Sequence, residues 1–152
     1  MMAQRYMSRE ATIEFEAGTG LEPIEAITNA ASAAYDESNS QIAFQVLMTT
    51  FQFEKKLMRE HFLENYVESE KFPKASFKGT YNNGTISGDL TIHGITKSIE
   101  VPGELTIDSG NATLTAAFSV LTADYGIEIP SVVKDKVAKS ANIKVSANLK
   151  AL

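Results

Sequence analysis

Apolar and polar residues alternate along most of this chain, with the period of two expected of β-strands that have one buried and one solvated face. The alternation is clearest from Lys71 to Ile107, where two short turns join three strand-like runs. Apolar residues in these runs share one parity, while Lys, Asp, Glu, Thr and Ser occupy the other. The pattern predicts an antiparallel sheet with one face in water.

The same alternation extends to both sides of this region. It predicts further strands over residues 12–17, 41–49, 112–122 and 142–151. Asn82-Asn83-Gly84 and Ser109-Gly110-Asn111 supply residues that accept positive φ angles in tight turns. The strands that flank these turns should therefore be hydrogen-bonded neighbours.

Two segments depart from the strand period. Phe53 to Tyr66 carries apolar residues at helical spacing and predicts an amphipathic helix of about three to four turns, which should cover one end of the sheet. We interpret its Met and aromatic stripe as core packing rather than as a cofactor site. Ile129-Pro130-Ser131 is expected to begin a short helical turn or loop before the last strand.

Composition narrows the class of protein. At 152 residues the chain suits one domain that can bury a core without metal or disulfide support. Its 14 basic and 19 acidic residues give a net charge of -5, and the basic residues are scattered, so nucleic acid is not an expected partner. No apolar run approaches the roughly 20 residues of a transmembrane helix. The absence of cysteine excludes thiolate catalysis and Cys-based metal centres.

Candidate catalytic and metal-binding chemistry is sparse. The only histidines are His61 and His93, and the residues four positions beyond them, Asn65 and Lys97, are not usual metal ligands. No G-x-S-x-G elbow is present, and we interpret Asp89 as a hydrogen-bonding residue near a turn. The glycines form no phosphate-binding motif. We therefore expect no enzyme activity, no catalytic residues, no metal and no cofactor.

The predicted inner face of the sheet is rich in aromatic residues. In a barrel of about eight strands, such side chains either fill the lumen or line a cavity for one ligand. Periodicity alone leaves both outcomes open. Small inward residues, among them Ala116, Ala147 and Gly88, reduce the volume that fills the centre and favour a cavity.

Three short motifs stand out along the chain. They are Phe72-Pro73-Lys74-Ala75-Ser76-Phe77, then Gly88-Asp89-Leu90-Thr91-Ile92-His93-Gly94-Ile95-Thr96-Lys97, and finally Asp124-Tyr125-Gly126. Together they resemble the YceI-like family of bacterial lipid-binding barrels. The resemblance implies an all-β fold, a single antiparallel lipocalin-like β-barrel of about eight strands with one amphipathic helix over an end. In many relatives an Arg precedes the last motif by two positions. Thr122 stands there in this chain, so no headgroup role carries over for that position.

The resemblance also decides one ambiguous segment. The alanines of residues 25–35 favour helix by intrinsic propensity. The family's second barrel strand falls here, and a closed barrel needs every strand paired, so we expect a strand. The barrel domain is expected over residues 12–152, and residues 1–11 are expected to be an N-terminal lead-in.

The function implied by the resemblance is binding, carriage or sequestration of an isoprenoid or other long-chain amphiphile in the lumen. The alternative is a ligand-free, side-chain-filled barrel that acts as an envelope interaction or stress-related module. The inward residues expected to contact a ligand are Phe15, Phe44, Val46, Phe77, Leu90, Ile92, Leu105, Leu114 and Phe118. A homodimer is compatible with the sequence.

The family's members are generally exported, which implies a periplasmic or secreted protein. The start, Met1-Met2-Ala3-Gln4-Arg5, lacks the apolar stretch of a secretory signal. It fits either a cytosolic protein or, better, a mature exported domain whose signal has been removed, because a small residue followed by Gln resembles a cleavage junction.

Overall fold

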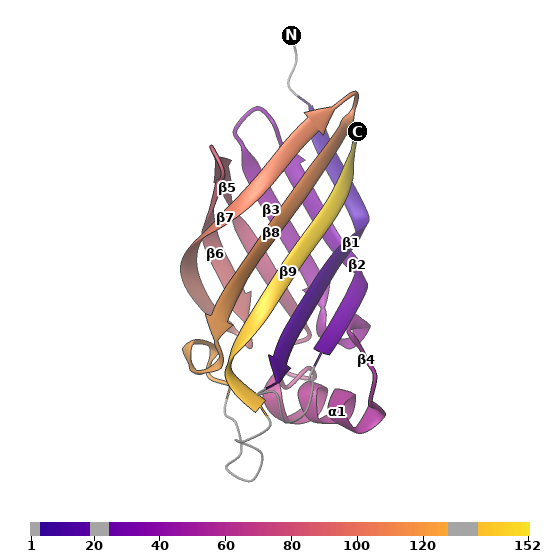
Figure 1. Cartoon of the computed structure of the whole chain (residues 1–152), viewed down its shortest axis with the longest axis vertical. Helices are drawn as coiled ribbons and strands as arrows, with labels where there is room; N and C mark the ends of the chain where they lie inside the picture. Colours follow the sequence, from indigo (N-terminus) through magenta and orange to yellow (C-terminus); the bar gives the residue numbers. More distant parts are fainter. Residues whose placement is uncertain (1–3, 19–24, 128–136) are drawn as a thin grey trace.

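The chain forms one antiparallel sheet that closes into a barrel (Figure 1). This is seen in a computed structural model that describes residues 4–18, 25–127 and 137–152. The long strands of these residues are β1 (Arg5–Gly18), β2 (Glu25–Asp36), β3 (Gln41–Leu47), β5 (Lys74–Asn82), β6 (Thr85–Ile92), β7 (Ile95–Asp108), β8 (Asn111–Leu121) and β9 (Val137–Ala151). Their hydrogen-bonded order is β1-β9-β8-β7-β6-β5-β3-β2, and the additional β1–β2 pairing completes the circle. The predicted all-β, lipocalin-like barrel of about eight strands is confirmed.

Tight turns join the central strands, as the sequence predicts. Asn83 and Gly84 have φ angles of 46° and 88°, and Ser109 and Gly110 have 48° and 83°. Two successive positive φ angles are typical of a type I′ turn, whose twist matches the right-handed twist of the flanking strands. His93 and Gly94, between β6 and β7, form a third turn of this kind.

The helical segment is shorter than the sequence predicts. Helix α1 spans Lys56–His61 and continues as a π-helical turn, η2, over Phe62–Tyr66. The prediction that the helix starts at Phe53 is wrong, because Phe53 belongs to the short strand β4 (Gln52–Phe53), where it pairs with Ala26 of β2. Two 3-10 turns, η1 (Met48–Thr50) and η3 (Thr122–Tyr125), follow β3 and β8.

Several strand boundaries also differ from the sequence prediction. β1 begins at Arg5 rather than Thr12, because Tyr6 is already paired with Tyr35 of β2 and with Ala151 of β9. β9 begins at Val137 rather than Asn142. The turn η1 ends β3 at Leu47, two residues early. Ile129-Pro130-Ser131 lies outside the described residues.

Residues 25–35 form a strand, as expected, within β2. This strand pairs with β1, and the register shifts around Ala11, whose partner is Ala31. Pairing with strands on both sides satisfies the backbone groups of β2, and this outweighs the helical preference of alanine. Intrinsic propensity therefore misleads here.

The barrel has two different ends (Figure 1). Helix α1, η2, the β6–β7 turn and η3 lie at what we call the helical end. Gln4, where the described chain begins, Leu152 and the turns around residues 38, 83 and 110 lie at the opposite, hairpin end. Chain direction fixes this arrangement, because β1, β3, β6 and β8 run toward the helical end while their antiparallel neighbours run back.

Candidate functional site

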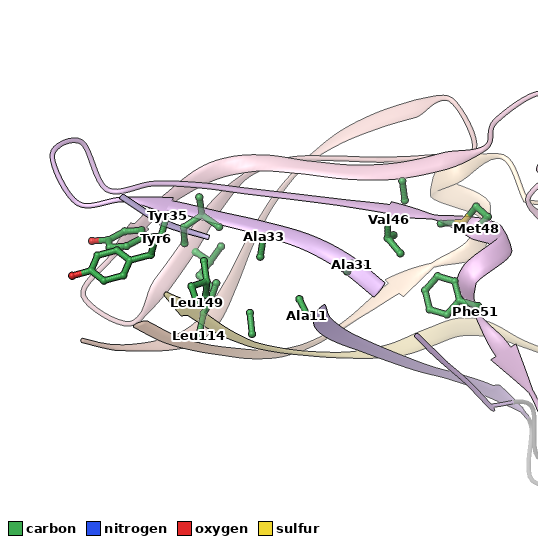
Figure 2. Close-up of a cluster of buried hydrophobic side chains, with 14 of the residues drawn as sticks. Tyr6, Ala11, Ala31, Ala33, Tyr35, Val46, Met48, Phe51, Leu114 and Leu149 are labelled. Atoms are coloured by element: carbon green, nitrogen blue, oxygen red, sulfur yellow. The ribbon is translucent and has the colours of Figure 1, made fainter. Parts of the chain in front are cut away.

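Side chains fill the lumen at the hairpin end. Figure 2 shows Tyr6 and Tyr35 side by side, with Leu114 and Leu149 next to them. The tyrosine rings stack with centroids 6.1 Å apart, and Leu114 and Leu149 are 1% and 0% exposed. Tyr6, Tyr35 and Leu149 are buried and do not line the cavity described next, so protein atoms occupy the lumen around them, and Leu114 lies between them and that cavity.

The other half of the lumen holds a cavity of about 200 Å³. Its wall is apolar: the polar side chains among the described residues that line it are those of Gln45, Tyr66, Ser76, Thr122 and Tyr125, and none of the described lining residues carries a charge. Apolar cavities of about 150 Å³ are known to stay dry and to admit small apolar molecules. The cavity can therefore accept hydrocarbon rather than water.

Most of the residues predicted to contact a ligand lie on this cavity wall. Phe15, Phe44, Val46, Phe77, Leu90, Ile92, Leu114 and Phe118 all line it. They come from β1, β3, β5, β6 and β8, and the period of two places them on the inner face. Leu105 does not line the cavity. It pairs with Leu114 and packs against the cluster of buried hydrophobic residues.

Several aromatic side chains on the cavity wall are incompletely buried, whereas Val46, Leu90 and Leu114 on the same wall are buried. Phe15, Phe44, Phe77 and Phe118 are only partly buried, although they point inward. Large aromatic side chains in a well-packed interior normally contact protein on all sides. These rings instead present apolar surface to the cavity, which a hydrophobic ligand would cover.

A cluster of four phenylalanines borders the cavity at the helical end. Phe15 of β1 has ring centroids 5.2 Å from Phe51, 5.9 Å from Phe53 and 5.1 Å from Phe62. Phe62 in turn lies 6.0 Å from Phe51 and 5.1 Å from Phe53. The cluster attaches η2 and β4 to the barrel wall. The sequence alone places Phe51, Phe53 and Phe62 near the predicted helix but does not join them to Phe15. Three phenylalanines within residues 51–62 are nevertheless a usable signal of a cluster.

Two tyrosines lie at this end. Tyr66 and Tyr125 both line the cavity. Burial raises the pKa of Tyr66, and burial followed by the Asp124 carboxylate raises the pKa of Tyr125. Both phenols therefore remain protonated at neutral pH.

Three segments of the helical end meet at His93. One ring nitrogen, Nδ1, lies 2.9 Å from the backbone oxygen of Tyr125, and the other, Nε2, lies 2.9 Å from Oε1 of Glu68. The ring of Phe72 packs edge-on against the imidazole, with centroids 4.9 Å apart. We call Glu68, His93 and Tyr125 the histidine clasp. Periodicity could not reveal it, since its members are 25 and 32 residues apart from His93 in sequence.

Glycine is required next to the clasp. Gly94 has φ of +74°, and a Cβ there would lie 2.5 Å from the Phe72 ring. The absence of a side chain at Gly94 lets Phe72 cover the turn. Phe72, His93 and Tyr125 belong to the three motifs that resemble the YceI-like family. These motifs therefore lie together in the fold.

Other kinds of site were sought in the described residues. Across residues 4–18, 25–127 and 137–152, no group of three or more His, Asp or Glu side chains is placed to hold a metal ion. Within the same ranges, no helix combines the length and the apolar character that crossing a bilayer requires.

The fold and its apolar cavity define a lipocalin-like β-barrel. Residues 7–151 match the family model of the YceI-like domain, and the chain belongs to this family. A search of curated proteins finds no match.

Solved structures share the fold at low sequence identity. The polyisoprenoid binding domain from Saccharophagus degradans, implicated in plant cell wall breakdown, has a TM-score of 0.83 and 9% identity, over 99% of this chain and 100% of that one. Burkholderia cenocepacia BcnA has a TM-score of 0.77 and 14% identity, over 91% and 95%. The Campylobacter jejuni YceI protein has a TM-score of 0.62 and 17% identity, over 81% and 83%.

Proposed function

We propose that this protein binds an isoprenoid or another long-chain amphiphile, with an apolar tail in the cavity at the helical end of the barrel. The observation that carries the proposal is the apolar cavity of about 200 Å³ lined by partly buried phenylalanines. The binding of polyisoprenoid by the Saccharophagus domain, which shares the fold, supports the choice of ligand class.

Hydrocarbon burial is sufficient to hold such a ligand. Each CH₂ group removed from water contributes about 0.8 kcal/mol. A charged group in the same cavity would lose its hydration without gaining a partner of opposite charge from the described wall. The tail therefore occupies the cavity, and the polar end of the ligand lies toward the helical end, near Tyr66 and Tyr125.

The filled hairpin half limits how much of a ligand is enclosed. Tyr6, Tyr35 and Leu149 occupy the lumen there. A long isoprenoid fits only if part of it extends out of the helical end or if the cavity widens on binding. The same packing is the specific observation in favour of the alternative, a filled barrel that acts as an interaction module.

A carrier of this kind needs neither a cofactor nor a catalytic residue, and we propose a binding role rather than an enzymatic one. We also propose export to the periplasm or the outside of the cell, in keeping with the YceI-like family to which the chain belongs. Fractionation of the native host tests the location directly.

Native mass spectrometry of the protein purified from its own host tests the ligand proposal. We expect an added mass that disappears on organic extraction and that chromatography of the extract identifies as a long-chain lipid. The extracted protein should also take up an isoprenoid quinone. A protein that carries no lipid and takes up none favours the filled-barrel alternative.

A further inference from the structure

His93 is enclosed between two hydrogen-bond acceptors. Its side chain is 11% exposed, and its two ring nitrogens face a backbone carbonyl oxygen and a carboxylate oxygen. A neutral imidazole carries one N–H and therefore satisfies only one of these oxygens. The other nitrogen would then direct its lone pair at an acceptor. Only the doubly protonated, positively charged ring donates to both.

The charges around the ring support this assignment. Glu68 contacts the ring through Oε1, and its other oxygen, Oε2, lies 3.2 Å from Nζ of Lys71. The hydrogen bond from His93, followed by that from Lys71, lowers the pKa of Glu68 and keeps it anionic. On the η3 side the ring meets the Tyr125 carbonyl oxygen, and the Asp124 carboxylate acts on the phenol of Tyr125. An anionic partner stabilises a charged imidazolium.

Each member of the clasp adjoins the wall of the cavity. Tyr125 itself lines the cavity, and so do Val67, next to Glu68, and Ile92, next to His93. The clasp thus joins the end of the helical segment, the β6–β7 turn and η3 around one side of the cavity. Loss of the clasp would free these three segments from one another.

We propose that His93 is a proton-binding site that regulates access to the cavity, holding the helical end closed when charged and releasing it when neutral. The proposal rests on the proposed function, since it concerns exchange of the same ligand. Histidine ordinarily changes charge in the physiological pH range. When the ring loses one proton, whichever nitrogen is left bare directs its lone pair at an oxygen, either the Tyr125 carbonyl or the Glu68 carboxylate, and that contact becomes repulsive. Ligand exchange is therefore slow at acidic pH and faster at alkaline pH.

Nitrogen NMR of the imidazole rings tests the charge assignment without a ligand. At about pH 6 we expect both ring nitrogens of His93 to be protonated, with N–H signals protected from water. His61 serves as an internal comparison, because it is exposed and its Nδ1 lies 3.1 Å from the amide nitrogen of Asn65, a donor. A neutral His93 ring in the closed protein at this pH overturns the proposal.

Transfer of retinol, a fluorescent and uncharged isoprenoid alcohol, tests the regulation. Retinol-loaded protein is mixed with excess phosphatidylcholine vesicles at about pH 5.5 and about pH 8.5, on either side of the usual histidine range. We expect transfer to be about tenfold faster at the higher pH, the factor that follows from losing one charge-assisted hydrogen bond. Equal rates at the two pH values overturn the proposal.

Three variants separate the clasp from general effects on stability. In Glu68→Gln, the amide donates to a neutral His93 ring whose Nδ1–H still reaches Tyr125, so transfer should be slow at both pH values. In His93→Gln both N–H donors are on one nitrogen and cannot reach the two acceptors that separate ring nitrogens reach, so transfer should be fast at both. His61→Gln should keep the wild-type pH dependence. A pH dependence that persists in Glu68→Gln contradicts the proposal even if His93→Gln does not fold.

The failure of each proposal is distinguishable. Wild-type protein that binds no retinol and no quinone contradicts the proposed function. In that case amide hydrogen exchange at Val67, Ile92 and Tyr125 still reports whether the clasp holds its three segments together. The clasp is supported if exchange in the wild type accelerates with pH by more than intrinsic base catalysis explains, and exchange in Glu68→Gln does not. Identical behaviour of the two proteins overturns it.

Discussion

Gly79 of β5 and Gly88 of β6 are register partners on the inner face of the barrel, and neither has room for a side chain. A Cβ on Gly79 would lie 2.7 Å from the Cα of Gly88 and would collide with the carbonyl oxygen of Ser87. A Cβ on Gly88 would lie 2.5 Å from the Cα of Gly79. The paired glycines let the backbones of β5 and β6 approach closely at this point.

Gly88→Ala should therefore destabilise the barrel. The obstacle is backbone rather than a flexible side chain, so the strands must shift, at a cost of about 1–3 kcal/mol or more. Urea denaturation followed by circular dichroism measures the loss. Ser87→Ala, on the outer face of the same strand, is the matched control and should change stability by about 0.5 kcal/mol or less. Equal stability of the two variants would show that the strands yield easily.

Truncation of a core side chain should cost different amounts in the two halves of the barrel. Leu149→Ala removes a completely buried side chain and should cost about 2–5 kcal/mol. Phe44→Ala removes a larger ring, but that ring borders the cavity, so its cost in ligand-free protein should fall below the roughly 3–5 kcal/mol of a fully packed phenylalanine. Urea denaturation of extracted protein measures both. A full cost for Phe44→Ala would indicate that the lumen is packed there.

A charge on the cavity wall should abolish lipid retention. Phe118→Arg places an unpaired cation in the apolar cavity, whereas Ala117→Arg places the same group on the exposed face of β8. We expect lipid to co-purify with Ala117→Arg but not with Phe118→Arg. Circular dichroism must show an intact sheet in both. Lipid bound equally by both variants would place the ligand elsewhere.

Removal of one ring from the four-phenylalanine cluster should loosen the helical segment. Phe62 contacts three other rings, and Phe62→Ala removes all of these contacts. Because the ring is partly buried, the cost should be less than the roughly 3–5 kcal/mol of a fully packed phenylalanine, and it should be local. Amide hydrogen exchange should rise over residues 58–66 and remain unchanged in β7 and β8. Leu57→Ala, at a side chain that is 65% exposed, should change neither.

Asp36 should make the hairpin end sensitive to acid. Hydrogen bonds from the Ser38 hydroxyl and backbone N–H, with a smaller effect of Arg5, lower the pKa of Asp36. A lowered pKa in the folded state contributes stability above the unfolded pKa, and that contribution is lost as pH falls through the folded value. Asp36→Asn should be less stable than wild type at neutral pH, and the difference should vanish near pH 3 or below. Urea denaturation at several pH values measures this, and a difference independent of pH would contradict it.

Local patterns predicted the strand bodies and the turns because both depend on neighbouring residues. The period of two places Phe77, Leu90 and Phe118 on the inner face, and Asn83-Gly84 supplies the positive φ angles of a hairpin. The strand at residues 25–35 was different, because alanine propensity favours helix there. Only the resemblance to a family corrected it.

Features that depend on distant residues could not be predicted from the sequence. Tyr6 and Tyr35 fill the hairpin end because β1 starts early and pairs with the end of β2, a register that no local pattern encodes. Leu105 shares the inward parity of the other predicted contact residues, but it is not among the residues that line the cavity. Phe53 is a similar case. Its spacing predicts a helix, but it pairs with Ala26 of β2, a contact with a distant residue that local spacing does not encode.

The pairing of β1 with β9 has a consequence for how the chain folds. Tyr6 is the partner of Ala151, so the contact that closes the barrel joins residues almost the full length of the chain apart. Until β9 is in place, β1 and β8 each keep an open hydrogen-bonding edge that can pair with another chain. Folding should accordingly be slow, and a ribosome-bound chain that lacks β9 should depend on chaperones to prevent aggregation.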